Sequence, residues 1–277
     1  MTTMVVNGQR YALLLELAGT HYAGTAIQPA PIPTLHRHLA ECLDQLCPGT
    51  AASLQCCSRL DAGVAASCFT VHCDLNQNWS PTKLVQALNG LLRWPDHQRH
   101  ASCLAAAAVA ADWDAWRSAR SKTYRYRILC SGAPPLHQQH CLWLRRQPRH
   151  DILQQAAHLF LGQHDLSGFA CLRGDASDLW SPQRHILRSQ WEFDEDQRGQ
   201  WLTYEVCGTG FLYKQVRGMV GAMLSIASRD GESLISFSAA IAAGRQASRV
   251  GDVAPAKGLT LSAIDYGQAQ PNWQHPA

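Results

Sequence analysis

Residues 68–75 alternate strictly between apolar and polar side chains. A strand has a side-chain period of two, so its apolar members share one face and its polar members share the other. The apolar face holds Phe69, Val71, Cys73 and Leu75, and the polar face holds Thr70, His72 and Asp74. The pattern predicts a half-buried strand, which makes a sheet part of any fold that this chain adopts.

Leucines with the spacing of a helix occur both before and after this strand. Leucines at positions 35, 39, 43 and 46 lie on one face of a helix, with Thr34 placed as its N-cap. A second helix, which carries Leu84, Leu88 and Leu91, begins at Ser80-Pro81, because proline suits the first helical turn. Residues 11–17 form an apolar run consistent with a buried strand. The alanines of residues 104–111 favour a helix, but their position after a helix favours a strand, which we prefer. This order is a split βαβ arrangement.

The remainder of the chain repeats a similar rhythm from about residue 112. Alternating strands are predicted near residues 122–129, 185–194, 201–207 and 259–266, and helices near 151–161, 211–228 and 232–243. We therefore predict an α+β fold with helices packed on one face of a mostly antiparallel sheet. An N-terminal half covers residues 1–111, a C-terminal half covers residues 112–268, and a loose polar tail covers residues 269–277.

Composition allows a large core and sets few limits on partners. Hydrophobic residues make up 46% of the 277 residues and charged residues 16%, which does not suit a disordered chain. The net charge of +3 permits an RNA partner without demanding one. No run approaches the roughly 18 apolar residues of a membrane span, and residues 1–10 lack the pattern of a secretory signal. We expect a cytoplasmic protein with no membrane association.

Eleven cysteines raise the question of disulfides or zinc. Cys56 and Cys57 are adjacent, the others are scattered singly, and no Cys-x-x-Cys pair occurs. In a chain with no export signal this favours reduced, mostly buried thiols. A zinc site built from cysteine and histidine is the less favoured alternative, and we predict no metal.

Three stretches carry residues that are able to do chemistry. Asp61 lies in a short segment with Arg59 and Gly63. This segment is either a simple turn, or a site where the neighbouring arginine keeps the Asp61 carboxylate ionised. The alternation around Tyr124 describes an ordinary strand, or else an aromatic platform with cations on its other face. Arg217, off the apolar stripe of the long helix, is a solvated arginine or a guanidinium aimed at an anion. The residues alone leave these alternatives open.

Together these stretches resemble the TruA-type tRNA pseudouridine synthases, over about residues 11–266. The family's Arg-Thr-Asp-Ala-Gly-Val-His-Ala loop corresponds to Arg59-Leu60-Asp61-Ala62-Gly63-Val64-Ala65-Ala66, its Tyr-x-Tyr strand to Tyr124-Arg125-Tyr126, and its helix motif to Phe211-Leu212, Val216-Arg217 and Val220-Gly221. Two further matches are His164-Asp165-Leu166-Ser167-Gly168-Phe169 and Ala254-Pro255-Ala256-Lys257-Gly258-Leu259. Each motif is weak alone, but five of them in the right order are specific.

The chain also departs from the family pattern. The family usually has Asp at Ala18, Trp at Thr25, Thr at Leu60, His at Ala65, Gly-Gln at Cys68-Phe69, and Phe-His-Ala-Arg at Trp113-Asp114-Ala115-Trp116. These differences fall on RNA-facing positions more than on the carboxylate. We expect them to bear on substrate choice and efficiency, while Asp61, Tyr124 and Arg217 are retained.

The resemblance implies a fold of two α+β halves that share a central sheet, with the active cleft between them. It also implies a homodimer that acts on tRNA, usually on uridine of the anticodon stem-loop around positions 38–40. Asp61 would be the catalytic carboxylate, Tyr124 would stack on the target base, Arg217 would pair with Asp61, and Arg59 would help displace the base. The isomerisation involves no redox step, so no cofactor is expected.

Two other hypotheses stay open. The changed loop residues Leu60 and Ala65 suggest a tRNA-binding protein that has lost catalysis. The cysteines suggest a metal or redox protein. Isomerisation of uridine in tRNA remains the leading prediction.

Overall fold

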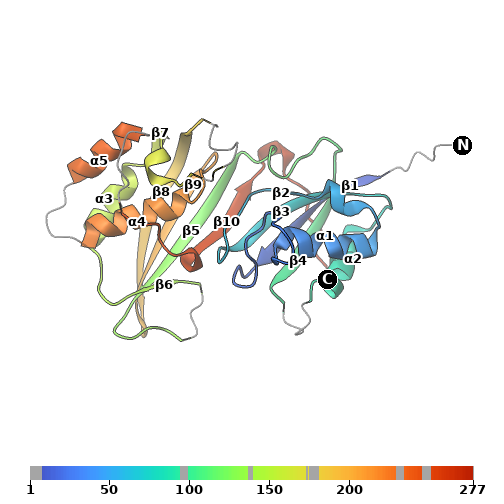
Figure 1. Ribbon diagram of the computed structural model, residues 1–277, viewed down its shortest axis with the longest axis horizontal. Helices are drawn as coiled ribbons and strands as arrows, with labels where there is room; N and C mark the ends of the chain where they lie inside the picture. Colours follow the sequence, from blue (N-terminus) through green and yellow to red (C-terminus); the bar gives the residue numbers. More distant parts are fainter. Residues whose placement is uncertain are drawn as a thin grey trace, which may run out of the picture. The chain divides into compact units, whose positions relative to one another are not determined.

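The computed structural model describes residues 8–93, 99–136, 140–172, 174, 181–228, 234–244 and 251–276. Its contacts divide the chain into two compact units, which are residues 1–120 with 261–277, and residues 121–260 (Figure 1). Both units combine strands with helices, which confirms the predicted α+β class.

The first unit contains the strand order β4-β1-β3-β10, with the short β2 paired to β3. The strands are β1 (Gln9–Leu17), β2 (Gln55–Cys56), β3 (Ala65–Leu75), β4 (Ala101–Val109) and β10 (Leu259–Asp265), whose last five residues belong to this unit. β1 pairs antiparallel with both β3 and β4. The helices are α1 (Leu35–Leu46) and α2 (Pro81–Leu91). Leu35, Leu39 and Leu43 are fully buried, so the predicted leucine face of α1 packs into the core.

Helix starts in this unit follow the sequence signals closely. The hydroxyl of Thr34 accepts a hydrogen bond from the Arg37 backbone N–H at 3.3 Å, which confirms Thr34 as the N-cap of α1. Ser80 makes no such bond, and α2 begins with Pro81 in its first turn. The ambiguous segment 104–111 lies in and after β4, which confirms the strand that we preferred.

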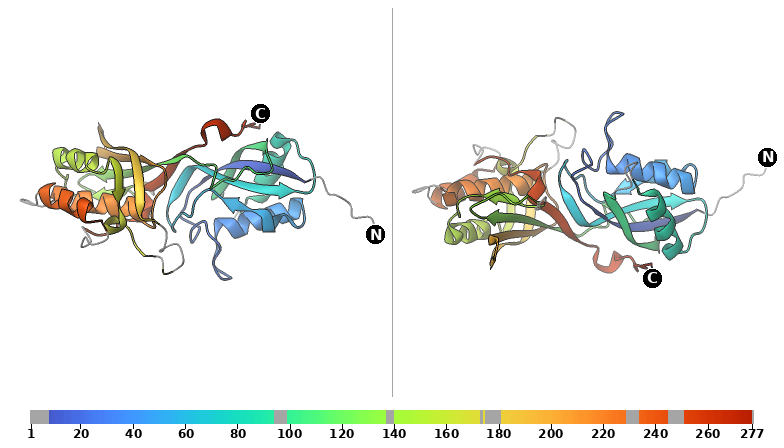
Figure 2. Two further views of the ribbon diagram at one scale, coloured as in Figure 1. Left: turned by 90° about the horizontal axis from the view of Figure 1, so that it is seen from above. Right: turned by 90° about the horizontal axis from the view of Figure 1, so that it is seen from below.

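The prediction that β3 is half-buried is wrong. The apolar face is buried as predicted, but Thr70 and His72 on the polar face are only 1% and 3% exposed. Figure 2 shows the reason: α1 lies on one side of the strands of this unit, and the C-terminal segment lies on the other. His72 packs edge-on against Trp113, with ring centroids 6.1 Å apart. The alternating pattern therefore predicted the strand correctly, but it did not predict which segments cover each of its two faces.

Residues 112–118, which the sequence places in a C-terminal half, pack within the first unit. Arg10 pairs with Asp74 through both its Nε and Nη2 atoms, and its Nη1 donates to the Trp113 carbonyl at 2.9 Å. The Ala115 backbone N–H donates to Nδ1 of His72 at 3.0 Å. Polar side chains of β1 and β3 thus hold residues 112–118. The local sequence did not predict the bond from Arg10 to Trp113 or the bond from Ala115 to His72.

The tail after residue 268, which we expected to be loose, is bound to the first unit. Ala106 of β4 and Gln274 exchange backbone hydrogen bonds of 3.2 and 2.9 Å. The indole N–H of Trp113 donates to the Ala269 carbonyl at 2.8 Å. A polar, proline-containing composition did not reveal these contacts, because they form with backbone groups distant in the chain.

Acid should destabilise the chain through His72. Burial and the positive charge of Arg10 lower the pKa of His72 below its ordinary value of 6.5. The unfolded chain therefore takes up a proton first as the pH falls below about 6.5, so stability present at pH 7.5 is progressively lost toward pH 5. In His72→Asn, the side-chain oxygen is able to accept from Ala115, and the loss between the two pH values should shrink.

Urea unfolding at pH 7.5 and at pH 5 measures this effect of His72. The control is His158→Asn, at an exposed site on α3 (His150–His158), which replaces a histidine outside the buried contact with Ala115. A loss in His72→Asn equal to that of wild type would contradict the prediction.

The second unit contains the strand order β5-β9-β8-β7, with β6 paired parallel to β5. The strands are β5 (Ser121–Cys130), β6 (Leu142–Leu144), β7 (Gly162–Asp165), β8 (Gln183–Asp196) and β9 (Gly199–Gly208). β9 pairs antiparallel with both β5 and β8, and β7 pairs antiparallel with β8. The helices are α3, α4 (Gln215–Ser228) and α5 (Leu234–Ala243). Tyr126, Leu202 and Tyr204 are fully buried on the face of the sheet that packs against these helices.

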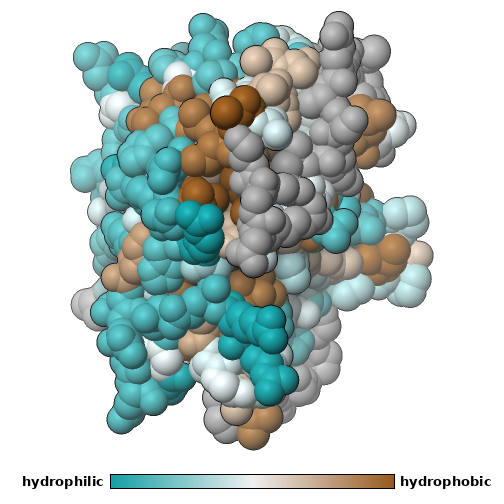
Figure 3. All heavy atoms as spheres, turned by 90° about the vertical axis from the view of Figure 1, so that its left-hand side faces the viewer, coloured by the Kyte–Doolittle hydropathy of each residue, from teal (hydrophilic) through white to brown (hydrophobic). Residues whose placement is uncertain are grey.

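One predicted helix of this unit has a different start. The long helix begins at Gln215 rather than at residue 211, because Lys214 has a positive φ of 59° and the Gln215 side chain accepts from the Leu212 N–H at 2.8 Å. The last helix is α5; the predicted residues 232 and 233 lie outside the described part of the chain. Figure 3 shows apolar side chains gathered on one face of the second unit. Ile235 of α5 is 80% exposed.

Candidate active site

The predicted catalytic residue, Asp61, lies in the first unit, in the loop between β2 and β3. A turn follows it at once: the Val64 N–H donates to the Asp61 carbonyl at 3.1 Å, and Gly63 adopts a positive φ of 82°. Asp61 is partly exposed, Arg59 is exposed, and Leu60 between them is only 7% exposed. Leu60 therefore anchors the loop in the core while its two charged neighbours stay accessible.

A second loop, residues 19–25, lies directly against the Asp61 loop. A Cβ atom added at Gly19 would lie 2.3 Å from the Val64 carbonyl oxygen, and one at Gly24 would lie 2.7 Å from that of Leu60. Both glycines also have positive φ values, 76° and 103°. The Gly63 N–H donates to the Gly19 carbonyl at 3.1 Å. The two glycines thus permit a backbone approach that fixes both ends of the Asp61 loop.

Tyr124 and Arg217 belong to the second unit. Tyr124 is 6% exposed on β5, and its ring meets that of Phe211 edge to face, with centroids 5.2 Å apart. Tyr126, two residues on, donates its hydroxyl to the Pro255 carbonyl at 2.8 Å; burial raises the pKa of this hydroxyl, and the charge of Arg217 acts in the opposite direction. The predicted tyrosine face of β5 is therefore confirmed as its buried face.

Arg217 projects from the first turns of α4 toward residues 252–255. Its Nε donates to the Ala254 carbonyl at 2.8 Å, and the Ala254 N–H donates to the Arg217 carbonyl at 3.1 Å. A Cβ atom at Gly221, one turn later, would lie 1.6 Å from the Asp252 carbonyl oxygen. Because Gly221 has no side chain, residues 252–255 lie directly on α4, and the Ala254 carbonyl is able to accept from the Arg217 guanidinium. Sequence reasoning missed this partner, although the 254–259 motif marked the segment.

The arginines on the outer face of β5 have partners in the protein. Arg125 and Arg188 each place Nε 2.7 Å from one oxygen of Glu205, whose side chain is 9% exposed. The guanidinium of Arg127 lies 4.4 Å from the centre of the Trp201 ring. The prediction that arginines occupy the face opposite the tyrosines is confirmed, and β9 supplies their partners.

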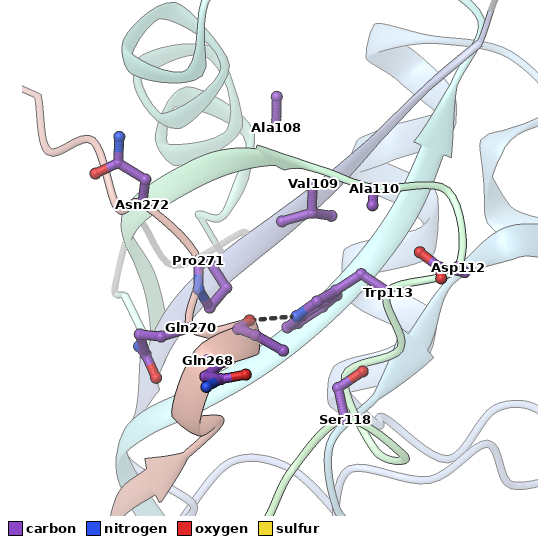
Figure 4. Close-up of a pocket in the computed structure, with 11 residues that line it drawn as sticks. Ala108, Val109, Ala110, Asp112, Trp113, Ser118, Gln268, Gln270, Pro271 and Asn272 are labelled. Carbon is purple, nitrogen blue, oxygen red and sulfur yellow. Dashed lines mark hydrogen bonds between the residues drawn. The ribbon is translucent and has the colours of Figure 1, made fainter.

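A hollow of about 370 Å³ occurs in the first unit (Figure 4). Its lining includes Asp112, Trp113, Ser118, Gln268 and Gln270. None of the four predicted site residues lines it. Figure 4 shows the Trp113 indole at its centre, joined to the Ala269 carbonyl by a hydrogen bond.

The cysteines are free thiols, and most of them are buried. All eleven cysteines are free; seven are buried and four are partly exposed. Burial raises the pKa of Cys42 to about 11 and that of Cys103 to about 12, which keeps these thiols protonated at neutral pH. Among the described residues, no three histidine, cysteine or acidic side chains are grouped so as to hold a metal ion. The same part of the chain has no helix long and apolar enough to span a membrane.

Comparison with known proteins places these features in a family. A family model described as tRNA pseudouridine synthase matches residues 156–267. Three proteins named tRNA pseudouridine synthase A are similar over nearly their whole length. The protein of Methylobacterium nodulans is 35% identical, and the match covers 94% of this chain and 97% of that protein. The protein of Roseobacter denitrificans is 32% identical, with 93% of this chain and 95% of that protein covered. The protein of Mesorhizobium japonicum is 33% identical, with 93% of this chain and 99% of that protein covered. The chain therefore belongs to the tRNA pseudouridine synthase A family, and it is an isomerase that acts on tRNA.

Proposed function

We propose that this enzyme converts uridine to pseudouridine in the anticodon stem-loop of tRNA, around positions 38–40, with Asp61 as its catalytic carboxylate. The observation that carries the proposal is the Asp61 loop itself. Its motif stands between β2 and β3, its backbone is held from both ends by residues 19–25, and Asp61 is partly exposed. A rigid loop that carries a partly exposed carboxylate residue suits a reaction that depends on positioning.

The reaction breaks the bond between N1 of uracil and C1′ of the ribose, turns the base, and joins C5 to C1′. The hydrogen on C5 leaves as a proton, and N1 gains one. The target nucleotide must leave the helical stack before a side chain reaches C1′. Asp61 then acts either as the nucleophile at C1′, or as the group that stabilises positive charge on the sugar and takes a sugar proton.

The other site residues have supporting roles. We propose that Tyr124 stacks on the target base and takes part in proton transfer, and that Arg217 pairs with Asp61. Arg59, which is exposed beside Asp61, helps to displace the base or fills its place in the stem. The proposed enzyme is a cytoplasmic homodimer that requires no cofactor.

Release of tritium from tRNA labelled at C5 of uridine tests the activity, because only a reaction that substitutes C5 frees this hydrogen. The purified enzyme should release tritium from unmodified tRNA with chelator present. Mapping of pseudouridine in tRNA from cells with and without the gene should show loss at positions 38–40. Tight tRNA binding with no tritium release would indicate the alternative, a tRNA-binding protein without catalysis.

A further inference from the structure

Thr25 is buried where the Asp61 loop meets the neighbouring loop, and the residue is 1% exposed. The Leu60 N–H donates to Oγ1 of Thr25 at 2.8 Å, and Oγ1 in turn donates to the Ser58 carbonyl at 3.2 Å. The Thr25 N–H donates to the Leu60 carbonyl at 3.1 Å. One residue, Thr25, therefore binds both backbone groups of Leu60, the residue immediately before Asp61.

The other side of Thr25 is attached to a rigid element. The first two N–H groups of α1 donate to the carbonyls of this loop, that of Leu35 to Gly24 at 3.2 Å and that of His36 to Thr25 at 3.3 Å. Such groups have no partner within a helix, so an external acceptor satisfies them. A continuous path of hydrogen bonds thus joins the packed helix α1 to Thr25, and Thr25 to Leu60.

We infer that Thr25 is a positioning residue that fixes Asp61 by holding Leu60 against the start of α1; this rests on the proposed role of Asp61. A hydroxyl is the group required, because it accepts from one backbone group and donates to another at the same time. Thr25 and Leu60 are both positions where this chain departs from the family motif, and here they contact each other directly. The hydroxyl held against the catalytic loop comes from residue 25, whereas residue 60 contributes an apolar anchor.

Substitution of Thr25 separates positioning from folding. Thr25→Val keeps the shape but removes the hydroxyl that binds the Leu60 N–H and the Ser58 carbonyl. Because misplacement of a catalytic group by about 1 Å costs up to about 100-fold, we expect the single-turnover rate of tritium release to fall about tenfold. The dissociation constant for tRNA should change by less than about twofold, because a defect in positioning lowers the rate rather than binding. Thr25→Ser, which retains the oxygen, should recover the rate to within about threefold.

Thr50→Val is the matched control. Thr50 is also buried, at 3% exposed, and its hydroxyl donates to the Cys47 carbonyl at 2.6 Å, in the turn that follows α1. This variant should lower the melting temperature and leave the rate unchanged. If Thr25→Val does not fold, Thr25→Cys replaces it, because a thiol is a weak donor and acceptor, and the same loss of rate is expected.

Two results would overturn the inference: a Thr25→Val rate equal to that of Thr50→Val, or a Thr25→Ser rate as low as that of Thr25→Val. Asp61→Asn, measured beside them, distinguishes this failure from failure of the proposed function. If Asp61→Asn is inactive while Thr25→Val is normal, only the role of Thr25 is wrong. If Asp61→Asn remains active, the assignment of Asp61 is wrong whatever Thr25 does.

Discussion

Asp61→Asn should abolish tritium release from labelled tRNA and leave tRNA binding and stability close to wild type. The amide has the shape of the carboxylate but neither its charge nor its capacity to bond to C1′ or to take a proton. Removal of a group that acts on the reacting atoms costs about 10²-fold to 10⁴-fold in rate for a proton-transfer role and more for a nucleophile. The Asp61 carbonyl accepts from Val64, so the turn keeps its backbone bond in the variant.

Two measurements are needed for this result: the single-turnover rate of tritium release, and the dissociation constant for the same tRNA. Asp112→Asn serves as the control, because Asp112 is exposed in the same unit and lies in the 112–118 segment rather than in the Asp61 loop. The control should be as active as wild type. An Asp61→Asn rate within tenfold of wild type would remove Asp61 from the chemistry.

Gly221→Ala should destabilise the enzyme by about 3 kcal/mol, the upper part of the usual range for overpacking. An alanine in the middle of a helix is normally favourable relative to glycine. Here the added Cβ would lie 1.6 Å from the Asp252 carbonyl oxygen, so α4 or the 252–255 segment has to move. Backbone atoms are unable to turn aside as the end of a flexible side chain does. The same displacement pulls the Ala254 carbonyl away from Arg217.

Gly90→Ala is the matched control for this effect. Gly90 lies in α2, and apart from its chain neighbours and the backbone of the same helix, no atom of the described residues is within 4 Å of a Cβ built on it. That variant should gain about 0.5–1 kcal/mol. Chemical denaturation measures both, and we expect the melting temperature of Gly221→Ala to fall by roughly 6–12 °C. Equal stability of the two alanine variants would show that the close approach at Gly221 is not tight in solution.

Local sequence determined the elements, and the resemblance of short motifs to a known family named the candidate site residues. Alternation identified β3, β5 and their faces, and the leucine spacing with Thr34 identified α1 and its start. These features depend on residues a few positions apart, whose side-chain directions follow from the period of the backbone. The Asp61 motif was readable for the same reason, since it is a short contiguous stretch.

Tertiary structure alone decided what surrounds these elements. The buried polar face of β3, the bound C-terminal tail, and the hydrogen bonds that hold Leu60 to Thr25 were not predicted. Each depends on a contact between backbone groups or buried polar atoms from segments far apart in the chain. Such contacts leave no periodic signal, because one threonine or glycine in a loop looks the same whether or not another strand of backbone lies against it.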